Sequence, residues 1–157
     1  MDHRKISANI SYDPRFINIP ELKDTVASRI QYARIKRQLT TKRFAELSKT
    51  TYEYVWVLER GKRETCPAFP LLKRMAHVLK VSPIWLGCFD LMPETTLAEK
   101  LRKARFYHLK TLKEASEFFH VCSHTFIAWE KNRTAIHEEH LDEWLSVLCT
   151  PIEPHWE

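Results

Sequence analysis

Two glutamates and one histidine-containing stretch have side chains that could support catalysis or metal binding. Glu59 and Glu130 each follow an apolar run, and a carboxylate can act as a general acid or base. His120, Cys122 and His124 are three potential metal ligands. These three alternate along the sequence across an expected helix start, and no fourth ligand is in view. We therefore expect no metal site here.

The sequence lacks the short motifs of common enzyme classes. GxGxxG, GxxxxGK, GxSxG and HExxH are all missing, and the chain has only two glycines with which to form a phosphate-cradling loop. We therefore expect no enzymatic activity and no cofactor.

Basic and aromatic side chains occur together between residues 41 and 63. Flanking cations of this kind can clamp two phosphate strands, and aromatic side chains on a surface can contact either a nucleic acid or a protein. The alternative interpretation is an ordinary charged surface that keeps the chain in solution. The side chains in question are Lys42, Arg43, Tyr52, Tyr54, Trp56, Arg60, Lys62 and Arg63.

The elements that must position these residues are repeated along the chain. Residues 39–61, LTTKRFAELSKTTYEYVWVLERG, align without a gap with residues 110–132, KTLKEASEFFHVCSHTFIAWEKN, at an offset of 71. Apolar and acidic positions recur in register, as in Val55 and Phe126, or Glu59 and Glu130. The offset also holds upstream, where Ala33-Arg34 recurs as Ala104-Arg105. A repeat of this length predicts one structural unit present twice.

Helical patterns dominate both copies. We expect a helix along the stripe of Ile30 and Ala33, a short helix over 41–47, and a third helix that begins near Thr51. A fourth helix is expected over 71–79 and a fifth over 81–86, with Ser82 as its cap and Pro83 in its first turn. Two glycines are too few for a protein rich in β-hairpins. The sequence therefore predicts an all-α fold.

The stretch from about Phe89 to Thr96, which contains Pro93, is the expected boundary between the two units. We predict an N-terminal arm over 1–20, a first domain over 21–90 and a second domain over 91–157 that is truncated at its C-terminal end. The first domain has 14 Lys/Arg against 7 Asp/Glu, and the second has 8 against 11. The basic domain suits a polyanionic partner better than the acidic one, because phosphate attraction supplies most sequence-independent affinity for DNA.

Cysteine usage and hydropathy bear on the compartment. The four cysteines show no close pair and no CxxC spacing, and the first residues carry no apolar signal region. No stretch approaches the roughly 20 apolar residues that cross a bilayer. We expect a reduced, cytoplasmic protein with no membrane partner.

The first unit resembles the phage-repressor and Cro-like (Xre) family of helix-turn-helix proteins. The resemblance is carried by Leu39-Thr40, by Phe44-Ala45-Glu46-Leu47-Ser48, by Val55 with Leu58-Glu59-Arg60-Gly61, and by Ser82-Pro83-Ile84-Trp85-Leu86. The second unit resembles the family through Thr111-Leu112-Lys113-Glu114-Ala115, Phe119, Val121, Phe126 and Trp129-Glu130-Lys131-Asn132-Arg133. The resemblance of both units implies two tandem lambda-repressor-like bundles of four to five helices each.

The resemblance implies which residues serve DNA and which serve the fold. It pairs Glu59 with Arg34, and Glu130 with Arg105, in structural salt bridges. It places the third helix of each unit in the major groove of double-stranded DNA. The predicted DNA-contacting residues are Thr41, Lys42, Arg43, Thr51, Tyr52, Glu53, Trp56, Val57, Arg60, Lys62 and Arg63 in the first unit, and Lys113, Ser123, His124, Ile127, Lys131 and Arg133 in the second.

Two features depart from the usual pattern. The family favours glycine at the turn, where this chain has Lys49 and His120, and a left-handed backbone there costs a non-glycine residue about 1 kcal/mol. Glu53 and Trp56 are unusual base readers, because Glu accepts only from cytosine and an aromatic ring offers only apolar contact to thymine.

Two functions remain open from the sequence. In the first, the chain is a sequence-specific, repressor-like transcription regulator whose first domain dominates DNA contact, and whose second domain reads a neighbouring half-site or forms a dimer surface. In the second, it is a protein-interaction module, such as an antirepressor, antitoxin or assembly factor, that uses apolar surfaces of its recognition helices, as Tyr52, Trp56 and Ile127 indicate. A homodimer and a regulatory protein partner are both compatible with these alternatives.

Overall fold

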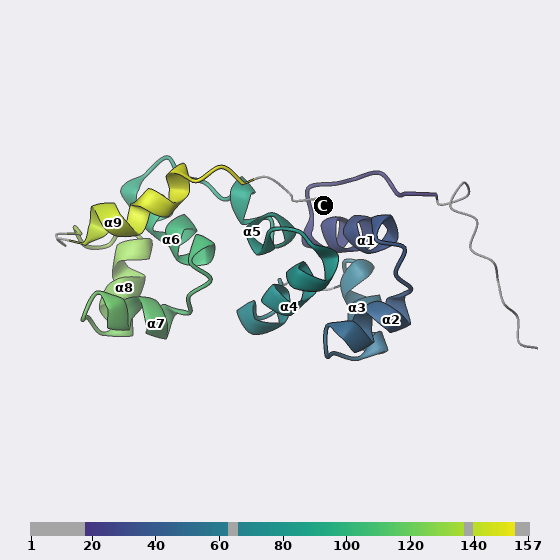
Figure 1. Ribbon diagram of the computed structural model, residues 1–157. Helices are drawn as coiled ribbons and strands as arrows, with labels where there is room; N and C mark the ends of the chain where they lie inside the picture. The colour runs from purple at the N-terminus through teal and green to yellow at the C-terminus, as the bar shows by residue number, and fades with distance from the viewer. Residues whose placement is uncertain (1–17, 63–65, 137–139, 153–157) are drawn as a thin grey trace, which may run out of the picture.

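The computed structural model describes residues 18–62, 66–136 and 140–152, and within these ranges the chain is helical with no strand. The helices α1–α5 lie on one side of the molecule and α6–α9 on the other (Figure 1). In chain order the elements are α1 Val26–Lys36, α2 Thr41–Leu47, α3 Tyr52–Glu59, α4 Phe69–Leu79, α5 Pro83–Leu86, the 3-10 helix η2 Phe89–Leu91, α6 Leu97–Tyr107, α7 Leu112–Phe118, α8 Ser123–Glu130, α9 Leu141–Leu145 and the 3-10 helix η3 Ser146–Cys149.

The first three helices recur at the offset seen in the sequence. The bounds of α1, α2 and α3 reappear in α6, α7 and α8 with every residue number larger by 71. We call α1–α3 the first repeat and α6–α8 the second repeat. α2 packs against α3 and α7 packs against α8, and in both repeats the leading helix contacts the third one. The repeated sequence therefore folds into a repeated arrangement of three helices.

Local signals fix where these helices begin and end. The hydroxyl groups of Thr25, Thr40 and Thr51 each accept a hydrogen bond from a backbone N–H in the first turn of the following helix. Left-handed residues follow the helices at matching places in the two repeats, including the turns at Lys49 and His120 that the sequence predicted. The six matching left-handed positions are Gln38 and Leu109, Lys49 and His120, and Gly61 and Asn132.

Two apolar clusters fill the interior and meet between the repeats. Phe44, Val55 and Met75 are fully buried in one cluster, and Leu101 and Phe126 are fully buried in the other. Val147 and Leu148 are packed against both clusters, and aromatic rings from α4, η2 and α6 pack together beside them. The centroid of the Phe106 ring lies 5.7 Å from that of the Phe69 ring and 5.0 Å from that of the Phe89 ring. The segment around Pro93 that the sequence marks as a boundary thus begins with residues packed in the core.

Two helix predictions were less accurate. The fourth helix begins at Phe69, two residues before the expected start, because Pro70 is accommodated in its first turn, where its missing N–H costs no hydrogen bond. The fifth helix begins at Pro83 rather than at Val81, with Ser82 as its cap as expected.

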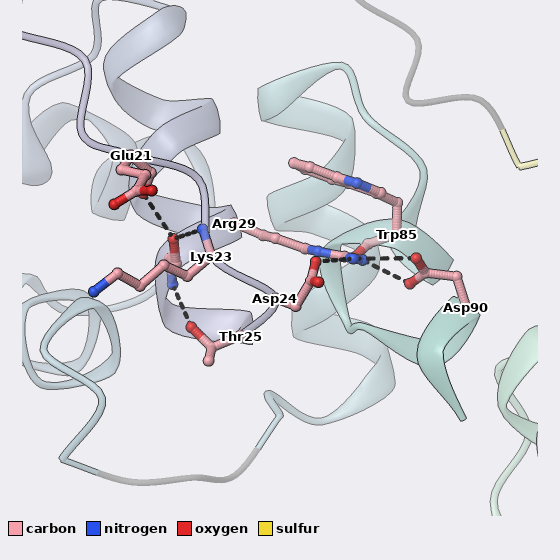
Figure 2. Close-up of polar contacts among 8 residues, drawn as sticks. Glu21, Lys23, Asp24, Thr25, Arg29, Trp85 and Asp90 are labelled. Carbon is pink, nitrogen blue, oxygen red and sulfur yellow. Dashed lines mark hydrogen bonds and ion pairs between the residues drawn. The ribbon is translucent and has the colours of Figure 1, made fainter. Parts of the chain in front are cut away.

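A buried arginine connects the N-terminal segment to the junction. The Arg29 guanidinium donates to the Trp85 carbonyl at 2.7 Å and to both carboxylate oxygens of Asp90 at 2.6 and 3.1 Å (Figure 2). It also donates to Asp24 at 3.1 Å, and it lies 5.1 Å from the centroid of the Trp85 ring. These contacts join α1, α5 and η2 through one side chain.

The two carboxylates around Arg29 should differ in their effect on stability. Asp90→Ala should lower the free energy of unfolding by about 2 kcal/mol, because it removes two charge-assisted hydrogen bonds from a buried guanidinium. Asp24→Ala should cost less than about 1 kcal/mol, because the Asp24 side chain is 75% exposed. Urea unfolding followed by circular dichroism measures both, and equal losses would contradict the assignment of Asp90 as the main partner.

Candidate nucleic-acid interface

The third helix of the first repeat presents one polar and aromatic face to solvent. Val55 and Leu58 are buried, which turns the opposite side of α3 outward. Tyr52 is 47% exposed and Glu53 is exposed, whereas Trp56 is half-buried. The Thr51 hydroxyl is held as the cap of this helix, 3.2 Å from the backbone N of Tyr54. The outward face of α3 is therefore formed at its first turn by Tyr52 and Glu53 and at its second by Trp56.

Cations surround Trp56. The guanidinium carbon of Arg60 lies 3.9 Å from the centroid of the Trp56 ring, and the Lys62 ammonium lies 5.4 Å from it. The negative face of an indole ring attracts cations at this range. Trp56 is thus a platform that holds two exposed positive charges beside the C-terminal end of α3.

Two further cations lie on α2. Lys42 and Arg43 are exposed in its first turn, and Arg43 makes a solvent-exposed ion pair with Glu46 at 3.3 Å. An exposed pair of this kind contributes little to stability and can exchange for another anion. The cations of α2 and those after α3 therefore lie on either side of the α3 face in sequence.

A buried ion pair fixes α3 to α1. The guanidinium of Arg34 donates to both carboxylate oxygens of Glu59, at 2.5 and 2.8 Å, and to the Leu39 carbonyl at 2.7 Å. In the second repeat Arg105 makes the same three contacts with Glu130 and with the Lys110 carbonyl. Both salt bridges predicted from the sequence are confirmed. Each one holds the third helix at a set angle to the first.

The second repeat presents a different face. The Ser123 hydroxyl lies 3.1 Å from that of Ser116, so it is occupied within the repeat, whereas His124 is exposed. Ile127 stands where the first repeat has Trp56, and it lines a hollow of about 290 Å³ together with Arg102 and Lys131. The second repeat therefore has an aliphatic side chain at the position where the first repeat has the Trp56 indole ring.

Most of the predicted DNA-contacting residues reach solvent. The half-buried ones are Thr41, Trp56, Val57, Ser123 and Ile127. The exposed ones are Lys42, Arg43, Thr51, Tyr52, Glu53, Arg60, Lys62, Lys113, His124, Lys131 and Arg133, with Lys113 paired to Glu117 at 4.0 Å. Arg63 and the N-terminal arm up to residue 17 lie outside the described residues.

Two apolar residues at the surface were missed in the sequence. Leu47 is 40% exposed at the end of α2, and Phe118 is 41% exposed at the end of α7. They occupy equivalent positions in the two repeats, separated by 71 residues. The alignment of the two repeats could have shown these residues, because both repeats have an apolar residue at the last position of the second helix. Phe118 also contacts Trp144 at 4.9 Å between ring centroids.

The pKa values of the Cys66, Cys88 and Cys122 thiols are shifted in different directions. A hydrogen bond with the Thr125 hydroxyl lowers the pKa of the exposed Cys122 thiol at the start of α8. Burial raises the pKa of Cys66 to about 12 and that of Cys88 to about 11, so both remain protonated thiols at neutral pH. In the parts of the chain that the structure describes, no group of three or more His, Cys, Asp or Glu side chains is placed to hold a metal ion.

Among the described helices, none combines the length and the apolar character needed to cross a membrane.

No protein-family model, no curated protein and no solved structure matches this chain. The resemblance to the phage-repressor family therefore stays a prediction, and the function must be argued from the residues of the chain itself.

Proposed function

We propose that this chain is a sequence-specific double-stranded DNA-binding regulator in which α2 and α3 form a helix-turn-helix. The observation that carries the proposal is the exposed face of α3, with cations on both sides of it in sequence. Tyr52 and Glu53 at its first turn are available to base edges, and Arg60 and Lys62 beyond its end are available to phosphates. Lys42 and Arg43 in the first turn of α2 add a second group of phosphate contacts.

The firm attachment of α3 favours this function. Reading base edges requires a helix whose position is fixed by the rest of the fold, and the Arg34–Glu59 pair supplies that constraint. The positive charge beside Trp56 is also placed by ring contacts rather than left on mobile side chains. Both features reduce the conformational entropy lost on binding.

The second repeat has the same three helices, but its half of the chain is acidic overall and should attract phosphates less strongly. We propose that α7 and α8 form a second helix-turn-helix that reads an adjacent half-site or mediates association between chains. In the view of Figure 1 the pairs α2–α3 and α7–α8 both lie along the lower edge of the molecule, an arrangement compatible with two contacts on one duplex. Its acidic surroundings, including Asp142 and Glu143 on α9, make it the lesser contributor.

Salt dependence of binding tests the proposal. Titration of a fluorescent random 20-base-pair duplex with the whole chain should give an affinity that falls steeply between low and high NaCl. Four exposed cations, Lys42, Arg43, Arg60 and Lys62, predict a slope of log K against log salt of about −3 to −4. Binding that is absent or insensitive to salt would contradict DNA binding by this face.

A protein-interaction module is the second candidate, favoured by the exposed apolar pair Leu47 and Phe118. Apolar residues that recur at the same surface position suit a protein partner better than a phosphate backbone. Under this function Leu47→Ser and Phe118→Ser would abolish partner capture, and random duplex would show no salt-dependent binding. Under the DNA-binding function the same two variants should bind duplex as well as the unaltered chain.

A further inference from the structure

A hollow of about 660 Å³ lies where the two halves of the chain meet. One wall comes from the end of α4, the α4–α5 link and α5. The other comes from Tyr107 at the end of α6, Val147 of η3 and the segment 150–152. Ligand sites form preferentially between domains, and this volume falls within the range that holds small molecules.

The lining has the chemistry of a site for an apolar anion. Val81, Ile84, Val147 and Ile152 supply an aliphatic wall, and the lining residues that the structure describes include no acidic side chain. Lys80 brings a positive charge and His77 adds an imidazole at the edge. The left-handed backbone at Lys80, with φ of 55°, ends α4 and sets where this side chain leaves the helix.

Hydroxyl groups complete the lining. Ser82 uses its oxygen to accept from the backbone N–H of Ile84, which leaves its own proton free to donate. Thr150 and Tyr107, which each carry a hydroxyl group, also line the hollow, and burial raises the pKa of Tyr107. A carboxylate accepts hydrogen bonds and pairs with a cation, so both features fit it better than they fit an amine.

We propose that this hollow binds a small amphipathic carboxylate, with its hydrocarbon chain against Val81, Ile84 and Val147 and its carboxylate beside Lys80. A molecule with about ten non-hydrogen atoms should bind with a Kd of about 1 mM. Because the two walls come from opposite halves of the chain, a bound carboxylate should also hold those halves together. The site does not depend on DNA binding, so the two proposals can fail separately.

Octanoate is a suitable probe, and octylammonium is its matched control with the same chain length and the opposite charge. Octanoate titrated into the full ¹⁵N-labelled chain should shift the backbone amide signals of Val81, Ile84, Tyr107 and Val147. Octylammonium should leave these signals in place. Equal shifts with both probes, or no shift with octanoate up to about 5 mM, would overturn the proposal.

Two variants test whether Lys80 and the lining of the hollow contact the bound octanoate. Lys80→Gln removes the positive charge, keeps a polar side chain and should weaken octanoate binding about fivefold, whereas the exposed Lys100→Gln on α6 should leave it unchanged. Thr150→Phe places a ring at an exposed position of the lining and should reduce binding by filling the hollow. Unaltered binding in both Lys80→Gln and Thr150→Phe would assign the octanoate to another part of the surface.

Discussion

Glu59→Ala should lower the free energy of unfolding by about 3–5 kcal/mol, because it leaves the buried Arg34 guanidinium without its carboxylate partner. The Arg34 side chain is 11% exposed and the Glu59 side chain is 7% exposed, so neither charge has water as a substitute partner. Within the described residues, removal of the carboxylate leaves the Leu39 carbonyl as the hydrogen-bond partner of Arg34. Urea unfolding followed by circular dichroism and tryptophan fluorescence measures the loss.

Two controls separate the loss of the pair from the loss of a negative charge. Glu46→Ala removes a carboxylate that is 52% exposed, in a pair with exposed Arg43, and should cost less than about 0.5 kcal/mol. The double variant Arg34→Met, Glu59→Leu fills the same space with apolar atoms and should recover most of the loss, because no unpaired charge stays buried. If Glu59→Ala were no more costly than Glu46→Ala, the pair would not be what fixes α3.

The second repeat offers an internal comparison. Arg105 and Glu130 are 9% and 8% exposed and make the same bonds, so Glu130→Ala should destabilise α6–α8 by a similar amount. Amide hydrogen exchange should show that each variant first loses protection in its own repeat. The halves share packed aromatic rings at Phe89 and Phe106, so some loss should spread across the junction.

The repeat offset explains why so much of the fold could be predicted from the sequence. Residues 39–61 carry local signals, namely hydroxyl caps and apolar spacing, and local signals determine short helices. The same signals recur 71 residues later, so each prediction was supported twice, and the Arg–Glu pairs followed from the family resemblance in both copies. A helix cap is predictable because its residues are close in sequence, and the buried Arg–Glu pairs are predictable because they recur at equivalent positions of the two repeats.

Contacts that appear only once were not predictable in the same way. Arg29 and Asp90 are 61 residues apart, and the repeat places no equivalent pair in the second half. Phe89 looked like part of a linker because Pro93 follows it, yet its ring is packed against Phe106. The hollow beside Lys80 likewise depends on how the two halves pack, which no local pattern encodes. Tertiary packing decides such features, and a single sequence records it weakly.

The double variant Arg60→Gln, Lys62→Gln should weaken binding to every DNA duplex by at least about tenfold at moderate salt. Both side chains are exposed and lie beside the Trp56 ring, where two phosphates could replace water as their partners. Loss of two phosphate contacts should also reduce the slope of log K against log salt by about 2. Fluorescence anisotropy with one random duplex and one selected duplex measures both quantities.

The repeat supplies the matched control for this prediction. Lys131 and Arg133 stand 71 residues after Arg60 and Lys62, are also exposed, and have Ile127 in place of the Trp56 ring. Lys131→Gln with Arg133→Gln changes the net charge by the same amount and should reduce affinity less, because the second half is acidic overall. Arg60→Lys keeps the charge but loses the flat contact with Trp56, so it should fall between the unaltered chain and the double variant.

Each pattern of losses assigns the DNA-contacting surface differently. A larger loss from the first pair places the dominant phosphate contacts beside α3, as the charge distribution predicts. Equal losses from the two pairs would mean that both repeats contact the duplex to the same degree, as two half-sites would require. If neither pair altered affinity or salt slope while circular dichroism showed the fold intact, the cations beside Trp56 would not contact phosphates, and the exposed apolar positions Leu47 and Phe118 would become the leading interface.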